Sequence, residues 1–146
     1  MYKSGVEQFA WPSDVRKDAG EEGAEEMRIF IADDSVIVRE RLTELLLELP
    51  EVEIVGEAGT AGDATLAIRE LKPDVVILDI QMPGGSGIDV LRTIRQEHLA
   101  SRVIMLTNNS YERYREMCLG AGADFFFDKS TEFEKVITVC RELSGN

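Results

Sequence analysis

Polar side chains directly follow four short apolar runs of this sequence, and they are of the types that hold a metal ion or a phosphoryl group. Carboxylates that share one site repel one another, so a cluster of them requires a cation. Oxygen-only ligands favour Mg²⁺, and zinc or iron is disfavoured because histidine and cysteine are absent from these positions. In chain order the residues are Asp33 with Asp34, Asp79, Thr107, and Asp128 with Lys129.

The lysine and the threonine of this set indicate an anion beside the metal. A phosphoryl group carries charge on three oxygens, and Mg²⁺, Lys129 and Thr107 could each take one of them. Asp79 stands alone after its apolar run and is the expected nucleophile, which would form an aspartyl phosphate, while Asp33 and Asp34 would hold the metal. Taken singly, each residue also suits a turn, a helix N-cap or a charged surface, so only the ordered set favours a site.

The placement of these residues depends on a regular alternation along the chain. Runs rich in β-forming residues alternate with segments in which apolar residues recur every three or four positions. Five strands alternating with five helices predict an α/β fold, with a parallel sheet, helices on both faces and right-handed crossovers. Ligands of such sheets bind at the carboxyl ends of the strands. The expected strands cover residues 28–32, 52–57, 75–78, 103–106 and 125–127.

Three of the helices carry more detailed predictions. The helix over residues 35–49 should bury one apolar stripe, whereas the helix over residues 110–119 has a poor stripe and should bury little. The last helix is expected to open with a capping box formed by Thr131 and Glu134. The two stripes are Val38, Leu42, Leu45 and Leu49 in the first helix and Tyr111, Tyr114 and Cys118 in the other.

The composition excludes several classes of protein. The chain has 146 residues, 44% of them hydrophobic, which suits one domain with a real core. With 28 acidic against 16 basic residues the net charge is −12, so nucleic acid is not an expected partner. The apolar runs are too short to span a membrane. The two cysteines are expected in the core and make no disulfide framework, and without a secretory signal the expected location is the cytoplasm.

The first 26 residues differ from the remainder and are expected to form an acidic flexible tail outside the domain, which would cover residues 27–146. The tail holds three basic and seven acidic residues and shows almost no apolar periodicity. Phe9, Trp11 and Pro12 are its exception, either as a few apolar residues of a disordered leader or as a docking peptide for a partner or a strap across the domain. A translation start at Met27 is a further alternative.

From Met27 onward the chain resembles the receiver domain of two-component response regulators. The resemblance rests on the acidic residues and Lys129 named above, on Thr107, and on two further segments. These are Met82-Pro83 with Gly87 after Asp79, and the run Gly120-Ala121-Gly122-Ala123-Asp124. It implies a flavodoxin-like, doubly wound five-stranded parallel sheet in the order 2-1-3-4-5 with five flanking helices.

The resemblance also implies a role for each site residue. Asp79 would accept a phosphoryl group from a phosphohistidine on a sensor histidine kinase or a histidine phosphotransfer protein. Asp34 would bind Mg²⁺ directly and Asp33 through water, with Asp79 and the backbone carbonyl of Gln81 as further ligands. Thr107 and Lys129 would contact the phosphoryl oxygens.

The same family pattern implies a switch that carries the signal. Phosphorylation would draw the Thr107 hydroxyl inward and let Phe126 fill the vacated space, which would change the surface of the helix over residues 110–119, the strand over residues 125–127 and the last helix. This face is also a candidate surface for a homodimer. Gln81 and Asn109 flank the path of an attacking water and should tune the phosphoryl lifetime. Ser130 stands where many receivers have a proline after a cis peptide bond.

The expected function is a stand-alone, single-domain response regulator that signals through contacts with an unknown target protein. The sequence ends at Asn146, directly after the last helix, which leaves no room for an output domain. The chain would catalyse only its own phosphorylation and dephosphorylation. A phosphate sink or relay receiver is one alternative. Another is a Mg²⁺-dependent aspartyl-phosphate phosphohydrolase, although Gln81 stands where that enzyme would need a general acid.

Overall fold

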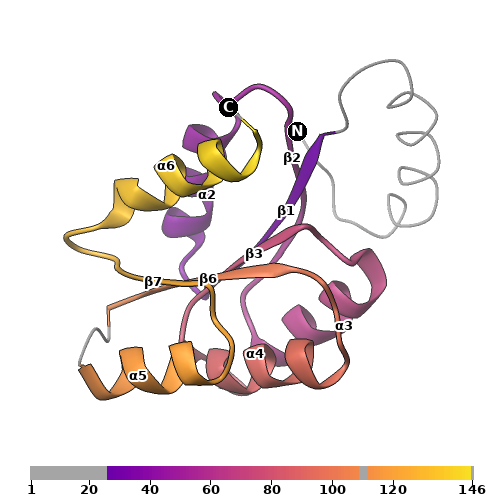
Figure 1. Ribbon diagram of the computed structural model, residues 1–146, viewed down its shortest axis with the longest axis vertical. Coiled ribbons are helices and arrows are strands. Elements are labelled where there is room, and N and C mark those ends of the chain that lie inside the picture. Colours follow the sequence, from indigo (N-terminus) through magenta and orange to yellow (C-terminus); the bar gives the residue numbers. More distant parts are fainter. Residues whose placement is uncertain (1–25, 109–111, 146) are drawn as a thin grey trace.

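A five-stranded parallel sheet lies between two layers of helices in the computed structural model, which describes residues 26–108 and 112–145 (Figure 1). The strand order is β2-β1-β3-β6-β7, and every neighbouring pair is parallel. This confirms the predicted doubly wound, flavodoxin-like order. The strands are β1 (Met27–Ala32), β2 (Val52–Ala58), β3 (Val75–Leu78), β6 (Arg102–Thr107) and β7 (Phe125–Asp128), and a small antiparallel hairpin pairs β4 (Gln81–Met82) with β5 (Gly85–Ser86).

Five helices of the described chain cover both faces of the sheet. Two of them, α2 and α6, lie on one face, and the other three lie on the opposite face (Figure 1). Ser35, Thr60 and Ser86 cap the first three helices, because each side-chain oxygen accepts a backbone N–H of the first turn. The helices are α2 (Val36–Leu46), α3 (Ala61–Leu71), α4 (Gly87–Gln96), α5 (Glu112–Gly120) and α6 (Phe133–Leu143).

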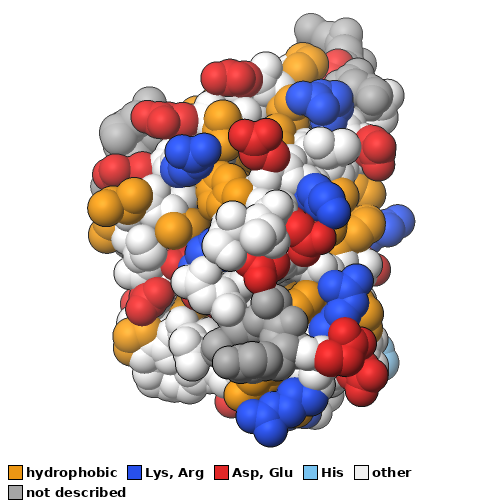
Figure 2. All heavy atoms as spheres, turned by 90° about the vertical axis from the view of Figure 1, so that its left-hand side faces the viewer, with side chains coloured by type: hydrophobic (Ala, Val, Ile, Leu, Met, Phe, Trp, Pro, Cys, Tyr) orange, Lys and Arg blue, Asp and Glu red, His pale blue; other side chains and the backbone are white. Residues whose placement is uncertain are grey.

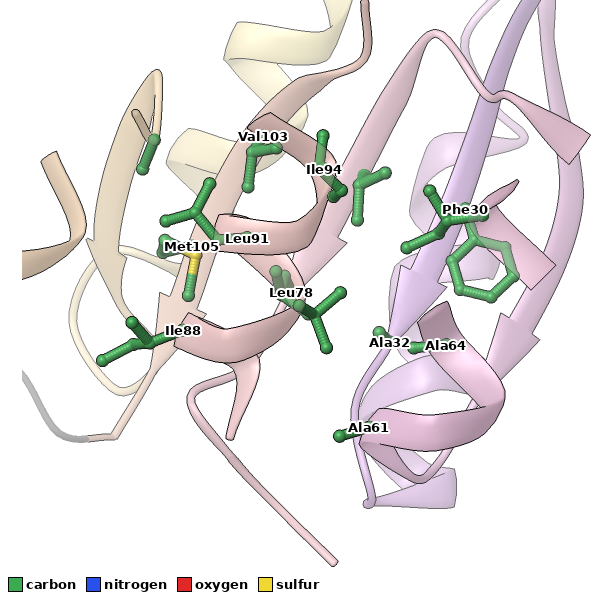
Figure 3. Packing of buried hydrophobic residues seen from close by; sticks show 14 of the residues in the cluster. Phe30, Ala32, Ala61, Ala64, Leu78, Ile88, Leu91, Ile94, Val103 and Met105 are labelled. Carbon is green, nitrogen blue, oxygen red and sulfur yellow. The ribbon is translucent and has the colours of Figure 1, made fainter. Parts of the chain in front are cut away.

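Alternation along the strands divides the apolar side chains between two cores. On β1, Ile29 and Ile31 pack toward α2 and α6, while Phe30 and Ala32 pack toward α3 and α4. All four are at most 1% exposed. Figure 3 shows the second of these cores, in which residues of α3 and α4 meet the strands. The sheet is therefore buried on both faces, as a parallel sheet requires.

The apolar stripe of α2 differs from the predicted one. The helix ends at Leu46 rather than at residue 49, and Leu46 is fully buried while Leu45 is partly exposed. Three consecutive leucines at positions 45–47 satisfy a helical spacing in more than one way. The tertiary packing against β1 and β2 selects Leu46.

The predicted capping box of α6 is wrong. The helix begins at Phe133, and its N-cap residue Glu132 makes no side-chain cap hydrogen bond. Instead, the Glu132 carboxylate accepts the Asp128 N–H at 2.9 Å, and Asp128 Oδ1 accepts the N–H groups of Ser130 and Thr131 at 2.7 and 3.2 Å. These bonds form a tight turn after β7, and they use the Thr131 N–H that the Glu134 carboxylate would have accepted in a capping box.

Several predictions fall on residues outside the described ones. They concern the acidic segment over residues 1–25, Asn109 and Tyr111. Cys118 and Cys140 are fully buried, as predicted for core residues. Among residues 26–108 and 112–145, no helix has the length and apolar content needed to cross a bilayer.

Candidate functional site

The carboxyl ends of the central strands bring the predicted site residues to one edge of the sheet. Asp33 follows β1, Asp79 follows β3, and Lys129 follows β7, while Thr107 is the last residue of β6. Backbone hydrogen bonds continue the sheet through these positions: the Asp79 N–H donates to Ala32, and the Lys129 N–H donates to Thr107 at 2.9 Å. Figure 2 views the molecule from this side, with acidic side chains near the middle of the face.

The Lys129 ammonium joins two buried carboxylates. Its Nζ atom lies 2.8 Å from Asp33 Oδ2 and 3.0 Å from Asp79 Oδ2. The side chains of the two aspartates are only 3% and 7% exposed, and that of the lysine is 11% exposed. Two carboxylates this close and this buried require a cation, and the ammonium meets part of that need.

Burial and pairing act in opposite directions on this cluster. Burial raises the pKa of the Asp33 carboxyl, and the hydrogen bonds from Lys129 and the Ser35 N–H only partly offset it. Burial also disfavours the Lys129 ammonium, but the hydrogen bonds and charges of Asp33 and Asp79 outweigh it and raise the pKa of the lysine. For the Asp33 carboxyl, burial thus outweighs pairing, whereas for the Lys129 ammonium pairing outweighs burial.

The Asp79 carboxylate is fixed by the loop that follows it. Its Oδ1 atom accepts the N–H of Ile80 at 2.7 Å. Gly87 donates its own N–H to the Ile80 carbonyl at 2.7 Å, which draws the start of α4 against the end of β3. A Cβ at Gly87 would lie 1.8 Å from the Asp79 carbonyl oxygen, so this position accepts only glycine.

Three carboxylates form an oxygen-only donor set that fits Mg²⁺. One oxygen from each of Asp33, Asp34 and Asp79 can be chosen so that all lie within 4.8 Å of one another. Asp34 is exposed, and together with Gln81 it lines an open groove of about 450 Å³. Carboxylates and a solvated opening suit Mg²⁺, which keeps several waters in its octahedral shell.

The two predicted switch residues are both buried. Thr107 is 1% and Phe126 is 4% exposed, on the neighbouring strands β6 and β7. The guanidinium of Arg115 on α5 lies 5.6 Å from the centre of the Phe126 ring and donates to the Phe126 carbonyl at 3.3 Å. The aromatic side chain thus lies inside the domain, with a cation over it.

Ser130 lies just after β7 and follows a trans peptide bond. None of the described peptide bonds is cis, so the Lys129–Ser130 bond is trans. The Ser130 hydroxyl and N–H both donate to Asp128 Oδ1, at 2.6 and 2.7 Å. The serine therefore holds the turn after β7 through hydrogen bonds to Asp128.

Residues that position the site were missed at the sequence level. Arg39 donates to the Asp33 carbonyl, and the Ser35 N–H donates to the Asp33 carboxylate at 2.9 Å. Arg39 lies in the first turns of a helix, and its sequence position does not distinguish it from an exposed surface arginine. The Asp-x-Ser order of residues 33–35 is a signal that could have revealed the second contact, because a carboxylate often accepts the N–H two residues later.

Comparison with known proteins identifies related sequences. Residues 29–141 match the family model of the response regulator receiver domain. The uncharacterized transcriptional regulatory protein YhcZ of Bacillus subtilis is 36% identical over 119 residues, which cover 82% of this chain and 55% of that protein. The DNA-binding transcriptional activator DevR/DosR of Mycobacterium tuberculosis is 32% identical over 119 residues, with the same two coverages. The chain thus spans about half the length of the curated relatives it matches.

Solved structures share the whole fold. A LuxR-family DNA-binding response regulator from Staphylococcus aureus superimposes with a TM-score of 0.75 at 30% identity, over 82% of this chain and 99% of that one. A chain of the CheX–CheY–BeF3–Mg²⁺ complex from Borrelia burgdorferi gives a TM-score of 0.76 at 26% identity, over 86% of this chain and 95% of that one.

Proposed function

Because this chain belongs to the receiver domain family of response regulators, we propose that it accepts a phosphoryl group on Asp79 from a phosphohistidine. One observation carries the proposal: Lys129 bridges Asp33 and Asp79 within a cluster of carboxylates at the carboxyl edge of the sheet. The ammonium of Lys129 can bind a dianionic phosphoryl group that enters this cluster. The bond from histidine nitrogen to phosphorus would break, and an Asp79 oxygen would bond to phosphorus.

Mg²⁺ would be held by Asp34 and Asp79 directly, by Asp33 through water, and by the backbone carbonyl of Gln81. The oxygen-only donor set of these carboxylates supports this assignment. When bound, Mg²⁺ neutralises charge on the phosphoryl oxygens during transfer.

Lys129 and Thr107 would hold the other two phosphoryl oxygens. The ammonium now contacts one oxygen each of Asp33 and Asp79, at 2.8 and 3.0 Å, and a short movement would bring it to the phosphoryl group. Thr107 lies at the end of the adjacent strand and could donate its hydroxyl. Such preorganised donors are the main source of catalysis in phosphoryl transfer.

The signal would pass through the face formed by α5, β7 and α6. Thr107 and Phe126 would couple the site to this face, and both side chains lie buried on the neighbouring strands β6 and β7. Met117 and Leu119 of α5 are 42% and 41% exposed, which leaves apolar area for a target protein or for a second copy of this chain. Gln81 and Asn109 would tune the phosphoryl lifetime.

A sensor histidine kinase or a histidine phosphotransfer protein would supply the phosphoryl group, as such proteins do for the family. The stand-alone organisation stays a prediction, since the curated relatives are about twice as long as the part that they share with this chain. DNA binding belongs by name to DevR/DosR of Mycobacterium tuberculosis. For this chain we propose output through protein contacts, with a phosphate sink or relay as the alternative role.

Incubation of the full chain with acetyl phosphate and Mg²⁺ tests the proposal. Intact-mass measurement should show one added phosphoryl group, which Asp79→Asn should abolish, because the amide is a poor nucleophile. Lys129→Ala should keep Mg²⁺ binding and weaken the structural response to phosphorylation. Labelling that survives Asp79→Asn would assign the nucleophile to another residue, and loss of Mg²⁺ binding in Lys129→Ala would make the lysine a structural residue.

A further inference from the structure

Arg39 of α2 contacts the backbone of the acidic pair rather than its carboxylates. Its Nη1 atom donates to the Asp33 carbonyl oxygen at 2.6 Å, and its Nε atom donates to the carboxylate of Glu57 on β2, with which it forms an ion pair. The side chain is 16% exposed. Glu57 lies beside β1, in register with Ile31. One guanidinium therefore links α2, β2 and the residue that follows β1.

The carbonyl that Arg39 holds belongs to the peptide group between Asp33 and Asp34. The Asp33 carboxylate has partners of its own, the Ser35 N–H and the Lys129 ammonium. The Asp34 carboxylate is different: within residues 26–108 and 112–145 no hydrogen bond or ion pair fixes its side chain. The orientation of its own backbone is what directs it toward Asp33 and Asp79.

The surroundings of Arg39 leave room for this contact. The Asp33 N–H donates to the Ala58 carbonyl at 3.0 Å, so both peptide groups of Asp33 are held. A Cβ at Gly59 would lie 3.1 Å from Arg39 Nη1, closer than ordinary van der Waals contact. Glycine at this position therefore lets the guanidinium reach the Asp33 carbonyl.

We propose that Arg39 is a positioning residue for the Mg²⁺ site, because it holds the Asp33–Asp34 peptide group and so aims the Asp34 carboxylate at Asp33 and Asp79. This inference rests on the proposed function, since it takes these carboxylates to bind Mg²⁺. The planar guanidinium makes two directed hydrogen bonds at once, to Glu57 and to the Asp33 carbonyl. The single ammonium of a lysine cannot reproduce that fork.

Calorimetric titration of the full chain with Mg²⁺ alone tests this role. Arg39→Met and Arg39→Lys should each raise the Kd for Mg²⁺ by about tenfold or more, the usual effect of losing a group that orients a metal ligand. The matched control is Arg69→Met, which removes an exposed arginine that joins α3 to Glu97 after α4. The control should leave the Kd unchanged.

The direction of the change in the Kd for Mg²⁺ distinguishes a positioning role of Arg39 from an effect of its charge. Removing a positive charge near a cation site would by itself strengthen Mg²⁺ binding. Weaker binding in Arg39→Met therefore cannot be a charge effect, and Arg39→Lys keeps the charge altogether. In metal-free protein, the NMR order parameter of the Asp34 amide should fall in both Arg39 variants and stay unchanged in Arg69→Met.

Two results would overturn the role of Arg39. One is a wild-type Kd for Mg²⁺ in both folded Arg39 variants. The other is a wild-type Kd in Arg39→Lys alone, which would show that the two directed hydrogen bonds of the guanidinium are not needed. Failure of the proposed function appears differently. Wild-type protein would then fail to bind Mg²⁺ or to become phosphorylated on Asp79, and the inference about Arg39 would fall with it.

Discussion

Helices α4 and α5 cover the same face of the sheet but are held to it very differently. Five of the ten residues of α4 are buried, whereas Cys118 is the one buried residue among the nine of α5. At the end of α4, Arg95 donates to the carbonyls of Gly122 and Ser101 and pairs with Asp124 at 3.0 Å. The helix that follows Asp79 is thus deeply packed, whereas α5, on the proposed output face, buries one residue and contacts β7 through Arg115.

This difference suits a protein in which the site must be rigid and the output surface must move. Preorganised groups catalyse phosphoryl transfer, so the loop that fixes Asp79 gains from a well-packed helix behind it. A helix that responds to a distant change gains from having few buried contacts, because a small free energy can then displace it. The predictions below are arranged by expected size and test whether the two helices differ in this way.

The largest effect is expected for Gly87→Ala at the start of α4. The added Cβ would lie 1.8 Å from the Asp79 carbonyl oxygen, so the end of β3 must move. The free energy of unfolding, measured in urea, should fall by more than about 4 kcal/mol. The matched control is Gly120→Ala in α5, where nothing lies within 4 Å of the added methyl group and stability should be kept or slightly raised. Equal losses of free energy of unfolding in the two variants would contradict the difference between α4 and α5.

A core truncation in α4 should come next. Leu91 is 0% exposed, and Leu91→Ala should lower the free energy of unfolding by about 2–5 kcal/mol through lost burial and the cavity left behind. Urea titration followed by circular dichroism measures the change. A loss below about 1 kcal/mol would mean that α4 is not the deeply packed helix described here.

The buried thiols predict an alkaline loss of stability. Burial raises the pKa of Cys118 to about 11 and that of Cys140 to about 12, from 9.0. Above pH 9 the unfolded chain loses these protons first, so stability should fall by at most about 1.4 kcal/mol per pH unit for each thiol. The fall should continue to about pH 11 for Cys118 and about pH 12 for Cys140.

Urea titrations between pH 8 and 11 measure this loss against a matched control. In the variant with Cys118→Ala and Cys140→Ala the alkaline slope should be shallower, because no thiol remains to ionise. A slope equal to that of the wild-type protein would show that neither thiol is held in its neutral form by folding.

The smallest effect is expected for Met117→Ala in α5. The side chain is 42% exposed, so its truncation should change the free energy of unfolding by less than about 0.5 kcal/mol. Thermal unfolding beside Leu91→Ala checks the contrast between the two helices. A loss of 2 kcal/mol or more would place α5 among the deeply packed elements.

Much of the fold could be predicted from the sequence, because local signals agree with tertiary packing in the central strands. The continuous apolar run of β3 is bounded by Pro73 and Asp79, and the strand covers the predicted residues Val75–Leu78. The capping box of α6 failed because the Asp128 carboxylate accepts the Thr131 N–H, which the Glu134 carboxylate would have accepted in a capping box. The convergence of Asp33, Asp79 and Lys129 followed from parallel topology alone. The contact of Arg39 did not, since it depends on a side-chain path that Gly59 leaves open.

Chemical trapping of the phosphoryl group tests the central claim most directly. Borohydride reduces an acyl phosphate to an alcohol, so protein labelled with acetyl phosphate and Mg²⁺ and then reduced should carry homoserine at one position. Peptide mass spectrometry should find that position to be Asp79. Homoserine at Asp33 or Asp34, or a phosphoryl group that resists borohydride, would contradict the account.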